Sequence, residues 1–398
     1  MTTTQDLPKL PFPPADTVLR IPPRFRQLLA DRAITKVRTY AGDVAWMPTR
    51  YDDVKALFDD PRLGRAHREP DKAARMNESQ VLGRPSGDFD GEERNHTAMR
   101  RLLTPAFSAR RMNALRPRIG GIITDLLDRM AADGPSADLH RHLSFPLPAL
   151  VICELLGVPY EDRERFRTWS TDMANMVDGD LAEAASAEFT AYMTALADRK
   201  RSEPADDVIS DLVAADSLSP QLVARLGVGL LFAGHETTMT RIDMGTVFLL
   251  SNPEQAAALR EDPALLPGAV EEILRFTSTE SNGGVLSRYA REDIELGDVT
   301  IAAGDLVLIP AGIANRDAAA FDDPDTFDIR RRSSVPHLSF GHGPHFCIGA
   351  SLARIELQEV FSVLLTRFPT LRLAVPVEEL RLRTATVTGG LAALPITW

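Results

Sequence analysis

The feature that most constrains the fold is a long helical stretch between Ser219-Pro220 and Asn252-Pro253. A Ser followed by a Pro is typical of a helix start, with the Ser as N-cap and the Pro at the first helical position. No proline interrupts the pattern before Pro253. The stretch allows a helix of about 30 residues, or about 45 Å at 1.5 Å per residue. Because the average helix is about a third of that length, we expect this one to cross the whole molecule.

The rest of the 398-residue chain has mostly the sequence pattern of helices, with two β-rich stretches. Residues 34–49 predict a hairpin around Gly42, and residues 285–309 predict strands with turns at Gly297 and Gly304. Because the predicted strands are scattered between helices, with no repeat or linker, we expect one mainly α domain with a minor β portion over residues 1–398. The Pro-rich residues 1–33 predict an irregular surface segment.

Composition excludes several classes of protein. A net charge of −11 and a pI near 5.3 argue against nucleic acid as a partner. The two cysteines, Cys153 and Cys347, exclude a disulfide-dense scaffold and fit a reducing compartment. No apolar run reaches the roughly 18 residues of a membrane span, and the N-terminus lacks a signal-peptide pattern. We therefore expect a cytoplasmic protein with no membrane or nucleic-acid partner.

The sharpest local pattern is the loop Phe340–Gly349, FGHGPHFCIG, directly before an amphipathic helix. Its glycines and proline predict a tight loop. The helix N-terminus would stabilise a thiolate at Cys347, which is a good metal ligand. Two alternatives are a buried inert cysteine and a zinc site. The zinc alternative rests on four nearby side chains, although ligands two residues apart close poorly on one ion. These are His337, His342, His345 and Cys347.

This loop resembles the haem-binding signature FGxGxHxCxG of the cytochrome P450 family at every fixed position. The resemblance implies that Cys347 is the axial thiolate ligand of haem b. It also implies that Phe340 and Gly341 belong to the haem-binding loop, and that His345 binds a haem propionate. Other matches, including VICELLGVP at 151–159, extend the resemblance over nearly the whole chain, and the fold it implies is that of the family.

The long helix carries an unusual segment, Ala233-Gly234-His235-Glu236-Thr237. A Gly inside a helix costs about 1 kcal/mol against Ala. The small residues therefore indicate a close approach, either by something flat or by a crossing helix. Thr237 is placed to bond the Ala233 carbonyl and bend the helix. The segment is similar to the oxygen-activation motif of the family. That resemblance implies haem contacts at Ala233 and Gly234, a proton held by Thr237, and proton relay through Glu236.

Three further features resemble the family. Glu272 and Arg275 resemble its ExxR pair, a buried structural ion pair. The family often adds an Arg in a PxRF segment, which here reads Pro324-Asp325-Thr326-Phe327, and Arg330 is the candidate substitute. Haem carries two propionates, and buried carboxylates need cationic partners. His96, Arg100 and Arg288 resemble the residues of the family that contact the propionates.

Two regions are expected to border the substrate. The first is the polar, Gly-rich loop 64–93, since loops of that length are usually functional. The second is the polar run 277–282, where Glu280 and Asn282 are the candidate substrate contacts. The family often has apolar residues and a Pro there, so this run predicts a pocket that hydrogen-bonds a polar substrate.

The function implied by the resemblance is haem-thiolate monooxygenation of a small organic molecule with dioxygen. The expected electron source is a ferredoxin with its NAD(P)H-dependent reductase, and the expected pathway is the tailoring of antibiotics and other secondary metabolites. We expect the ferredoxin to dock on a basic patch drawn from two arginine clusters. These are Arg100, Arg101, Arg110 and Arg111, and Arg330, Arg331 and Arg332.

Three other functions stay open. A haem-thiolate oxidase would catalyse coupling, desaturation or rearrangement without net oxygen insertion. A haem-based gas sensor would need no acid–alcohol pair, so Glu236 and Thr237 argue against it. The third alternative is a helical binding protein without haem.

Overall fold

The computed structural model describes residues 7–31, 34–77, 83–173, 179–214, 218–277, 285–383 and 389–398. These residues form two compact units. Unit 1 is drawn from Met1–Arg100, Glu271–Cys347 and Val387–Gly389, and unit 2 from Arg101–Val270, Ile348–Thr386 and Gly390–Trp398. The expectation of one domain over residues 1–398 stays a prediction. Glu280 and Asn282 lie outside the described residues.

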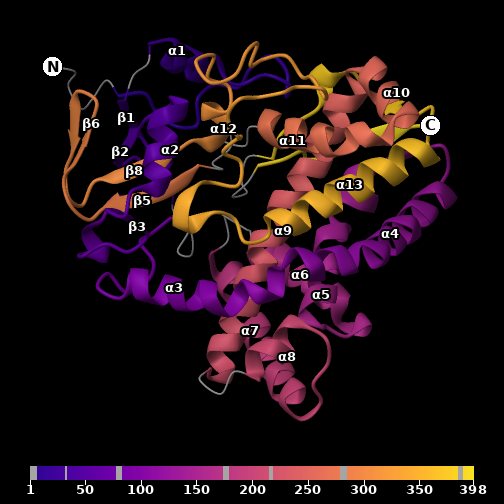
Figure 1. Ribbon diagram of the computed structural model, residues 1–398, viewed down its shortest axis with the longest axis horizontal. Helices are drawn as coiled ribbons and strands as arrows, with labels where there is room; N and C mark the ends of the chain where they lie inside the picture. Colours follow the sequence, from indigo (N-terminus) through magenta and orange to yellow (C-terminus); the bar gives the residue numbers. More distant parts are fainter. Residues whose placement is uncertain are drawn as a thin grey trace. The chain divides into compact units, whose positions relative to one another are not determined.

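Unit 1 contains a five-stranded sheet with the strand order β1-β2-β8-β5-β3 (Figure 1). Its strands are β1 (Thr35–Arg38), β2 (Val44–Met47), β3 (Leu63–Gly64), β5 (Leu286–Ala290) and β8 (Leu306–Ile309). The predicted hairpin is β1–β2, and its turn contains Gly42 at a φ of 89°. A second hairpin joins β6 (Ile294–Leu296) to β7 (Val299–Ile301) through Gly297 at a φ of 58°. Both turns need a backbone conformation that favours glycine, which is why the sequence predicted them.

Five α-helices or parts of α-helices in the described residues belong to unit 1. Four of them are α1 (Pro23–Asp31), α2 (Tyr51–Asp59), α12 (Ala311–Ala314) and the first part of α3 (Glu92–Leu103). The C-terminal part of α11 (Leu266–Phe276) is the fifth. Helix α3 has two acidic residues in its first turn, Glu92 and Glu93, where their charge interacts favourably with the helix dipole.

The prediction of a Pro-rich surface segment over residues 1–33 is wrong in two respects. Residues 23–31 form a helix, because Pro22 and Pro23 stand where a helix start tolerates proline. Leu10, Phe12 and Phe25 are also buried in a core shared with the sheet. Proline excludes regular hydrogen bonding but does not prevent the apolar side chains between prolines from being buried.

Unit 2 is mainly helical. Its helices are α4 (Ala109–Ala132), α5 (Pro146–Leu156), α6 (Arg163–Met173), α7 (Gly179–Ser202), α8 (Val208–Val213), α9 (Pro220–Leu250), α10 (Pro253–Glu261) and α13 (Ala350–Arg367). One turn of π-helix, η4 (His140–Ser144), precedes α5. A small sheet has the order β4 (Ser136–Asp138), β10 (Pro395–Thr397) and β9 (Arg372–Leu373).

Helix α9 is the predicted long helix, and its 31 residues begin and end where the sequence indicated. Ser219 caps it, because its Oγ accepts a hydrogen bond from the Leu222 N–H at 3.2 Å. Other helices of unit 2 pack against α9 in the described residues (Figure 1), namely α5, α6, α7, α8, α10 and α13. The prediction of a mainly α fold with a minor β portion is confirmed. In the described ranges no helix has the length and apolar character needed to span a bilayer.

Candidate functional site

The loop from Phe340 to Cys347 is closed by its own backbone. The Cys347 N–H donates to the Phe340 carbonyl at 2.8 Å. Gly341 and Gly343 have φ angles of 72° and 65°, and a Cβ at Gly343 would lie 2.3 Å from Asp59 Oδ1. Only glycine fits there. The loop leaves the Cys347 side chain exposed.

Cys153 has the opposite environment. It is fully buried in α5, and burial raises the pKa of its thiol to about 12. It is therefore the inert type of cysteine, whereas Cys347 is held at the surface of a shaped loop. The alternative of a buried inert cysteine applies to Cys153 and not to Cys347.

Residues just before the loop are tied to α11 and α12. Ser339 Oγ donates to the Leu274 carbonyl at 2.7 Å and accepts from Asn315 Nδ2 at 2.9 Å. Asn315 Oδ1 in turn accepts from the Leu338 N–H at 2.7 Å. The Tyr51 hydroxyl donates to the Pro336 carbonyl at 2.7 Å. The approach to the cysteine loop is therefore fixed by side chains from three separate elements.

Glu272 and Arg275 form the buried pair that the ExxR spacing implied. Arg275 donates from Nε and Nη2 to the two carboxylate oxygens at 2.7 and 2.8 Å, and both side chains are 2% exposed. The other guanidinium nitrogen, Nη1, donates to the Asn315 and Pro324 carbonyls at 2.9 Å. The pair thus connects α11 to the same Asn315 that holds the cysteine loop.

The arginine that joins Glu272 and Arg275 is Arg331, so the prediction of Arg330 is wrong. Arg331 Nε donates to Glu272 at 3.1 and 3.2 Å, and its Nη2 donates to the Thr326 carbonyl at 2.7 Å. Arg330 is exposed, and its backbone N–H donates to Asp328 Oδ1. After the turn at Asp328, the Arg330 side chain is exposed and the Arg331 side chain reaches Glu272. The Arg missing at Thr326 is replaced by one five residues later.

A cluster of cationic groups lies beside the loop in unit 1, and we call it the cationic cluster. The His96 and His345 rings are in contact, with centroids 3.9 Å apart and 34° between the ring planes. Arg100 Nη1 donates to the Phe346 carbonyl at 3.0 Å. Arg288 is 9% exposed and donates to the Ser287 carbonyl at 2.8 Å. The structure therefore brings together the four predicted propionate contacts, His96, Arg100, Arg288 and His345.

The mutual repulsion in this cluster is visible in the pKa values. Burial, followed by the charges of His96 and the nearby arginines, lowers the pKa of His345 to about 4. Burial, followed by the charge of Arg65, lowers the pKa of Arg288 to about 10. Arg65, whose charge acts on both groups, belongs to no motif. Only its place in the long loop 64–93, directly after Gly64, could have indicated a functional role.

The cationic cluster fits the two propionates of haem. In the described part of the chain, Arg288 makes no ion pair with a carboxylate. Glu92, the nearby acid, accepts from the Arg65 and Ala66 N–H groups and pairs with Arg291 at 3.4 Å. Buried cations of this kind are stabilised by an anion, and an exposed thiol at Cys347 is the donor that haem iron takes.

The described residues contain no zinc site, because no three side chains of His, Cys, Asp or Glu lie close enough together to hold a metal ion. His337 instead bonds Glu271, with Nε2 and Oε2 3.1 Å apart. The His345 ring contacts the His96 ring. Two of the four candidate ligands are therefore engaged elsewhere.

The four predicted residues of α9 lie in unit 2. Thr237 Oγ donates to the Ala233 carbonyl at 2.8 Å, as its spacing predicted. Both residues are exposed, whereas Glu236 is 4% exposed. The alcohol and the acid therefore point to different sides of α9, and the hydroxyl of Thr237 is the accessible one.

Gly234 is small because a helix crosses α9 at that point. A Cβ at Gly234 would lie 2.8 Å from Ile152 Cδ1 in α5. This is the crossing-helix alternative, and it accounts for Gly234 without a flat group. Next to it, His235 Nε2 bonds the Phe145 carbonyl at 2.8 Å, and burial lowers the pKa of this histidine to about 4. A neutral His235 therefore donates this hydrogen bond through Nε2–H.

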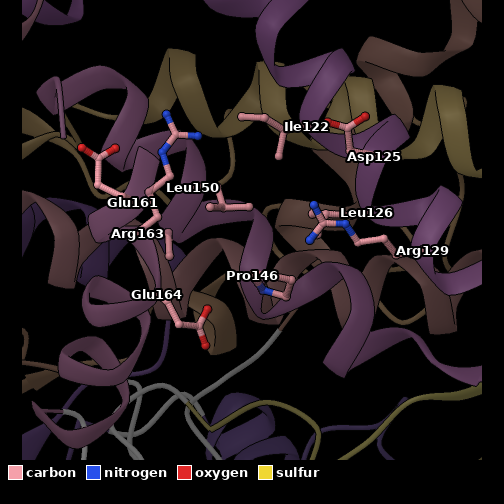
Figure 2. A pocket seen from close by; sticks show the side chains of 10 residues that line it. Ile122, Asp125, Leu126, Arg129, Pro146, Leu150, Glu161, Arg163 and Glu164 are labelled. Carbon is pink, nitrogen blue, oxygen red and sulfur yellow. The ribbon is translucent and has the colours of Figure 1, made fainter. Parts of the chain in front are cut away.

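A surface pocket of about 410 Å³ lies elsewhere in unit 2, between α4, α5 and the start of α6 (Figure 2). Leu126 and Leu150 are at the centre of the view, with charged groups such as Arg129 and Arg163 around them. None of the predicted site residues lines this pocket.

The chain is similar to known proteins over nearly its whole length. Residues 179–373 match the family model described as Cytochrome P450. The chain is 44% identical to the pentalenolactone synthase of Streptomyces exfoliatus, over 99% of this chain and 100% of that protein. It is 42% identical to the mycinamicin IV hydroxylase/epoxidase of Micromonospora griseorubida, over 94% and 95% of the two chains. The crystal structure of substrate-free PimD, a pimaricin epoxidase, superposes with a TM-score of 0.89 at 42% identity, covering 99% of this chain and 100% of that one.

Proposed function

The chain belongs to the cytochrome P450 family, and on that premise we propose that it hydroxylates or epoxidises a small secondary metabolite of the antibiotic type. It is a haem-thiolate oxidoreductase of the monooxygenase class. Bound haem supplies the activation of dioxygen, with two electrons that arrive one at a time. The names of the relatives, which include a hydroxylase/epoxidase and a polyene macrolide epoxidase, support this substrate class.

The observation that carries the proposal is the cationic cluster beside an exposed Cys347. In this assignment Cys347 would hold the iron, while the propionates would be held by Arg100, Arg288 and the contacting rings of His96 and His345. The hydrogen bonds from Ser339 and Asn315 fix the loop before the cofactor arrives. A preorganised loop of this kind binds with less loss of conformational entropy.

The proposed roles on α9 divide between two side chains. The Thr237 hydroxyl, which now donates to the Ala233 carbonyl, is free to turn and hold a proton at Oγ. The buried Glu236 carboxyl supplies a titratable group one residue earlier. Positioned acids of this type contribute about 10²–10⁴-fold to the rate of proton transfer.

The proposed electron donor is a ferredoxin with its NAD(P)H-dependent reductase. Three of the seven predicted arginines are already engaged, because Arg111 pairs with Asp206 and Asp211, Arg331 pairs with Glu272, and Arg100 donates to the Phe346 carbonyl. The other four are exposed and have no ion pair in the described residues, namely Arg330 and Arg332 in unit 1 and Arg101 and Arg110 in unit 2. Each is a proposed contact for an acidic ferredoxin. The cytoplasmic location stays a prediction.

A carbon monoxide difference spectrum of the reduced protein tests the cofactor assignment. We expect the red-shifted Soret band of a thiolate ligand in the parent and in Cys153→Ala. We expect Cys347→His to bind haem without that band and without activity. A Cys347→Ala protein with an unchanged spectrum would refute the assignment.

Product mass after reaction under ¹⁸O₂ tests the reaction itself. Hydroxylation and epoxidation add one labelled atom to the substrate. A product that carries no label would replace monooxygenation by coupling, desaturation or rearrangement.

A further inference from the structure

A second polar contact on α9 lies outside the residues assigned so far. Asp243 is fully buried, and its Oδ2 lies 2.7 Å from His140 Nδ1 in the π-turn η4. Its other oxygen, Oδ1, is buried and has no hydrogen-bond partner in the described part of the chain. A buried carboxylate satisfied on one side only is destabilising. Stability of the core alone does not account for Asp243.

The contact belongs to a closed circuit of hydrogen bonds. His140 is held by Asp243, and the His140 carbonyl accepts from the Phe145 N–H at 2.9 Å. The Phe145 carbonyl then accepts from His235 Nε2 at 2.8 Å. The circuit thus leaves α9 at Asp243 and returns to it at His235, directly before Glu236 and Thr237.

The middle of this circuit is the π-turn η4 (His140–Ser144). Single π-turns are rare and occur frequently at functional sites. Relaxation to an α-turn would shift the following residues by one position, about 100° around the helix axis. The Phe145 carbonyl would then turn away from His235. The bond from Asp243 to His140 holds the first residue of the turn and opposes that shift.

We propose that His140 and Asp243 are positioning residues, which keep the Phe145 carbonyl on His235 and so fix the segment of α9 that carries Glu236 and Thr237. The inference rests on the proposed function, because it concerns the same acid–alcohol pair. Neither residue contacts Glu236 or Thr237 directly in the described hydrogen bonds, so both act through His235. Without the tether, the Thr237 hydroxyl loses its fixed orientation and electrons are diverted from product to hydrogen peroxide.

Three variants separate this role from a general effect on stability. His140→Leu removes the bond to Asp243. His140→Asn restores it, because the Asn amide nitrogen takes the place of Nδ1 and donates to the carboxylate. Glu154→Gln is the control, in α5, the helix that follows η4. Glu154 pairs with Arg163 and Arg118, both at 2.7 Å. Arg163 lines the pocket of Figure 2, and neither Glu154 nor its two partners makes one of the three hydrogen bonds of the circuit.

The first readout is ¹⁵N NMR of labelled histidine in the reduced, carbon monoxide-bound protein, with His235 assigned by loss of its signal in His235→Gln. We expect a protected Nε2–H for His235 in the parent, in His140→Asn and in Glu154→Gln, and its loss in His140→Leu. The second readout is product formed per NAD(P)H. We expect at least a threefold fall in His140→Leu, with more peroxide, and recovery in His140→Asn. Glu154→Gln should lower the Tm without changing either readout.

An unchanged His235 signal and unchanged product yield in His140→Leu would overturn the proposal. Asp243→Asn, which keeps the shape and removes the charge, is the second variant if His140→Leu does not fold. It should give an intermediate yield, because a neutral hydrogen bond is about half as strong as a charge-assisted one, and a yield equal to the parent's would overturn the tether. If the parent itself forms no oxygenated product, the proposed function fails, while the His235 signal still tests the tether.

Discussion

Arg331 donates from Nε to both carboxylate oxygens of Glu272, at 3.1 and 3.2 Å. The same oxygens accept from Arg275 at 2.7 and 2.8 Å, so one buried carboxylate is shared by two guanidinium groups. Arg331 also donates to the backbone carbonyls of Asp322, Asp323 and Thr326. A side chain five residues from the expected position thus joins the segment around Thr326 to α11.

Replacing Arg331 should destabilise the protein. Arg331→Gln leaves Glu272 with one cationic partner and leaves backbone carbonyls without their donor. The free energy of unfolding in urea should fall by about 1–3 kcal/mol, the cost of unsatisfied buried polar groups. Arg330→Gln is the matched control next door, and because Arg330 is exposed the change there should stay within about 0.5 kcal/mol. Equal effects of the two substitutions would disprove the assignment of Arg331.

The cationic cluster predicts opposite effects of one substitution on cofactor retention and on the haem-free protein. Burial disfavours the charged form of Arg288 and lowers its pKa to about 10. Arg288→Met should therefore raise the free energy of unfolding of the haem-free protein by about 1–3 kcal/mol. It should also speed the transfer of haem to apomyoglobin, because a propionate loses its partner.

Arg291 provides the control for that experiment. It pairs with Glu92 at 3.4 Å and donates to the Phe89 carbonyl at 2.6 Å. Arg291→Met should lower the stability of the haem-free protein, not raise it. If Arg288→Met behaves in the same way, the cluster is not electrostatically strained.

His235 predicts a loss of stability in acid. Its pKa of about 4 in the folded protein lies below the ordinary value of 6.5, because burial disfavours the charged ring. Between these values the unfolded chain binds more protons than the folded one, so stability falls as the pH falls from about 6.5 to about 4. The full difference of 2.5 pKa units amounts to about 3 kcal/mol.

His235→Gln isolates this contribution. The Gln amide replaces the Nε2–H donor to the Phe145 carbonyl and does not titrate. The difference in free energy of unfolding between parent and variant should shrink by about 3 kcal/mol between pH 7 and pH 4. Parallel pH profiles for the two proteins would show that His235 titrates normally.

The docking patch predicts how salt affects reduction by ferredoxin. Arg330→Gln and Arg332→Gln should slow the second-order reduction rate several-fold at low salt and flatten its salt dependence, because exposed charges steer association. Stopped-flow reduction under carbon monoxide measures this rate. Arg111→Gln is the control, since Arg111 is already paired with Asp206 and Asp211. A reduction rate that does not respond to ionic strength would rule out the patch.

Local chemistry explains which features could be predicted from the sequence. The bounds of α9 follow from Ser219, Pro220 and Pro253, and the turns at Gly42 and Gly297 follow from the glycine itself. The cysteine loop and the Glu272–Arg275 pair are short-range patterns that resemble a known family. In each case the determinants lie within a few residues of one another.

The features that the sequence did not predict depend on long-range contacts. His140 and Asp243 are 103 positions apart and have no motif, so only the packing of η4 on α9 reveals their bond. The cause of Gly234 is Ile152 in another helix. Arg331 was missed because the direction of its side chain depends on the turn at Asp328, which spacing alone does not fix. Glu280 and Asn282 stay predictions.

Thr237 gives the sharpest test of the chemistry proposed for α9. Its hydroxyl is exposed and donates to the Ala233 carbonyl, so it can leave that bond to hold a proton. Thr237→Ala should bind haem, take up electrons and bind oxygen as the parent does. It should still consume NAD(P)H, but release more hydrogen peroxide and form less product per electron pair. Glu236→Gln should instead slow the whole cycle, because proton delivery is reduced.

Thr246→Ala is the control. Thr246 Oγ makes the same kind of hydrogen bond, to the Ile242 carbonyl at 2.9 Å. Unlike Thr237, Thr246 is buried, and it lies further along α9. Removing either hydroxyl deletes one side-chain bond to the helix backbone, so any effect of that bond on helix geometry appears in both variants. Only Thr237→Ala should change the ratio of peroxide to product. If Thr237→Ala couples electrons to product as well as the parent, another group, such as a hydroxyl of the substrate, handles the proton.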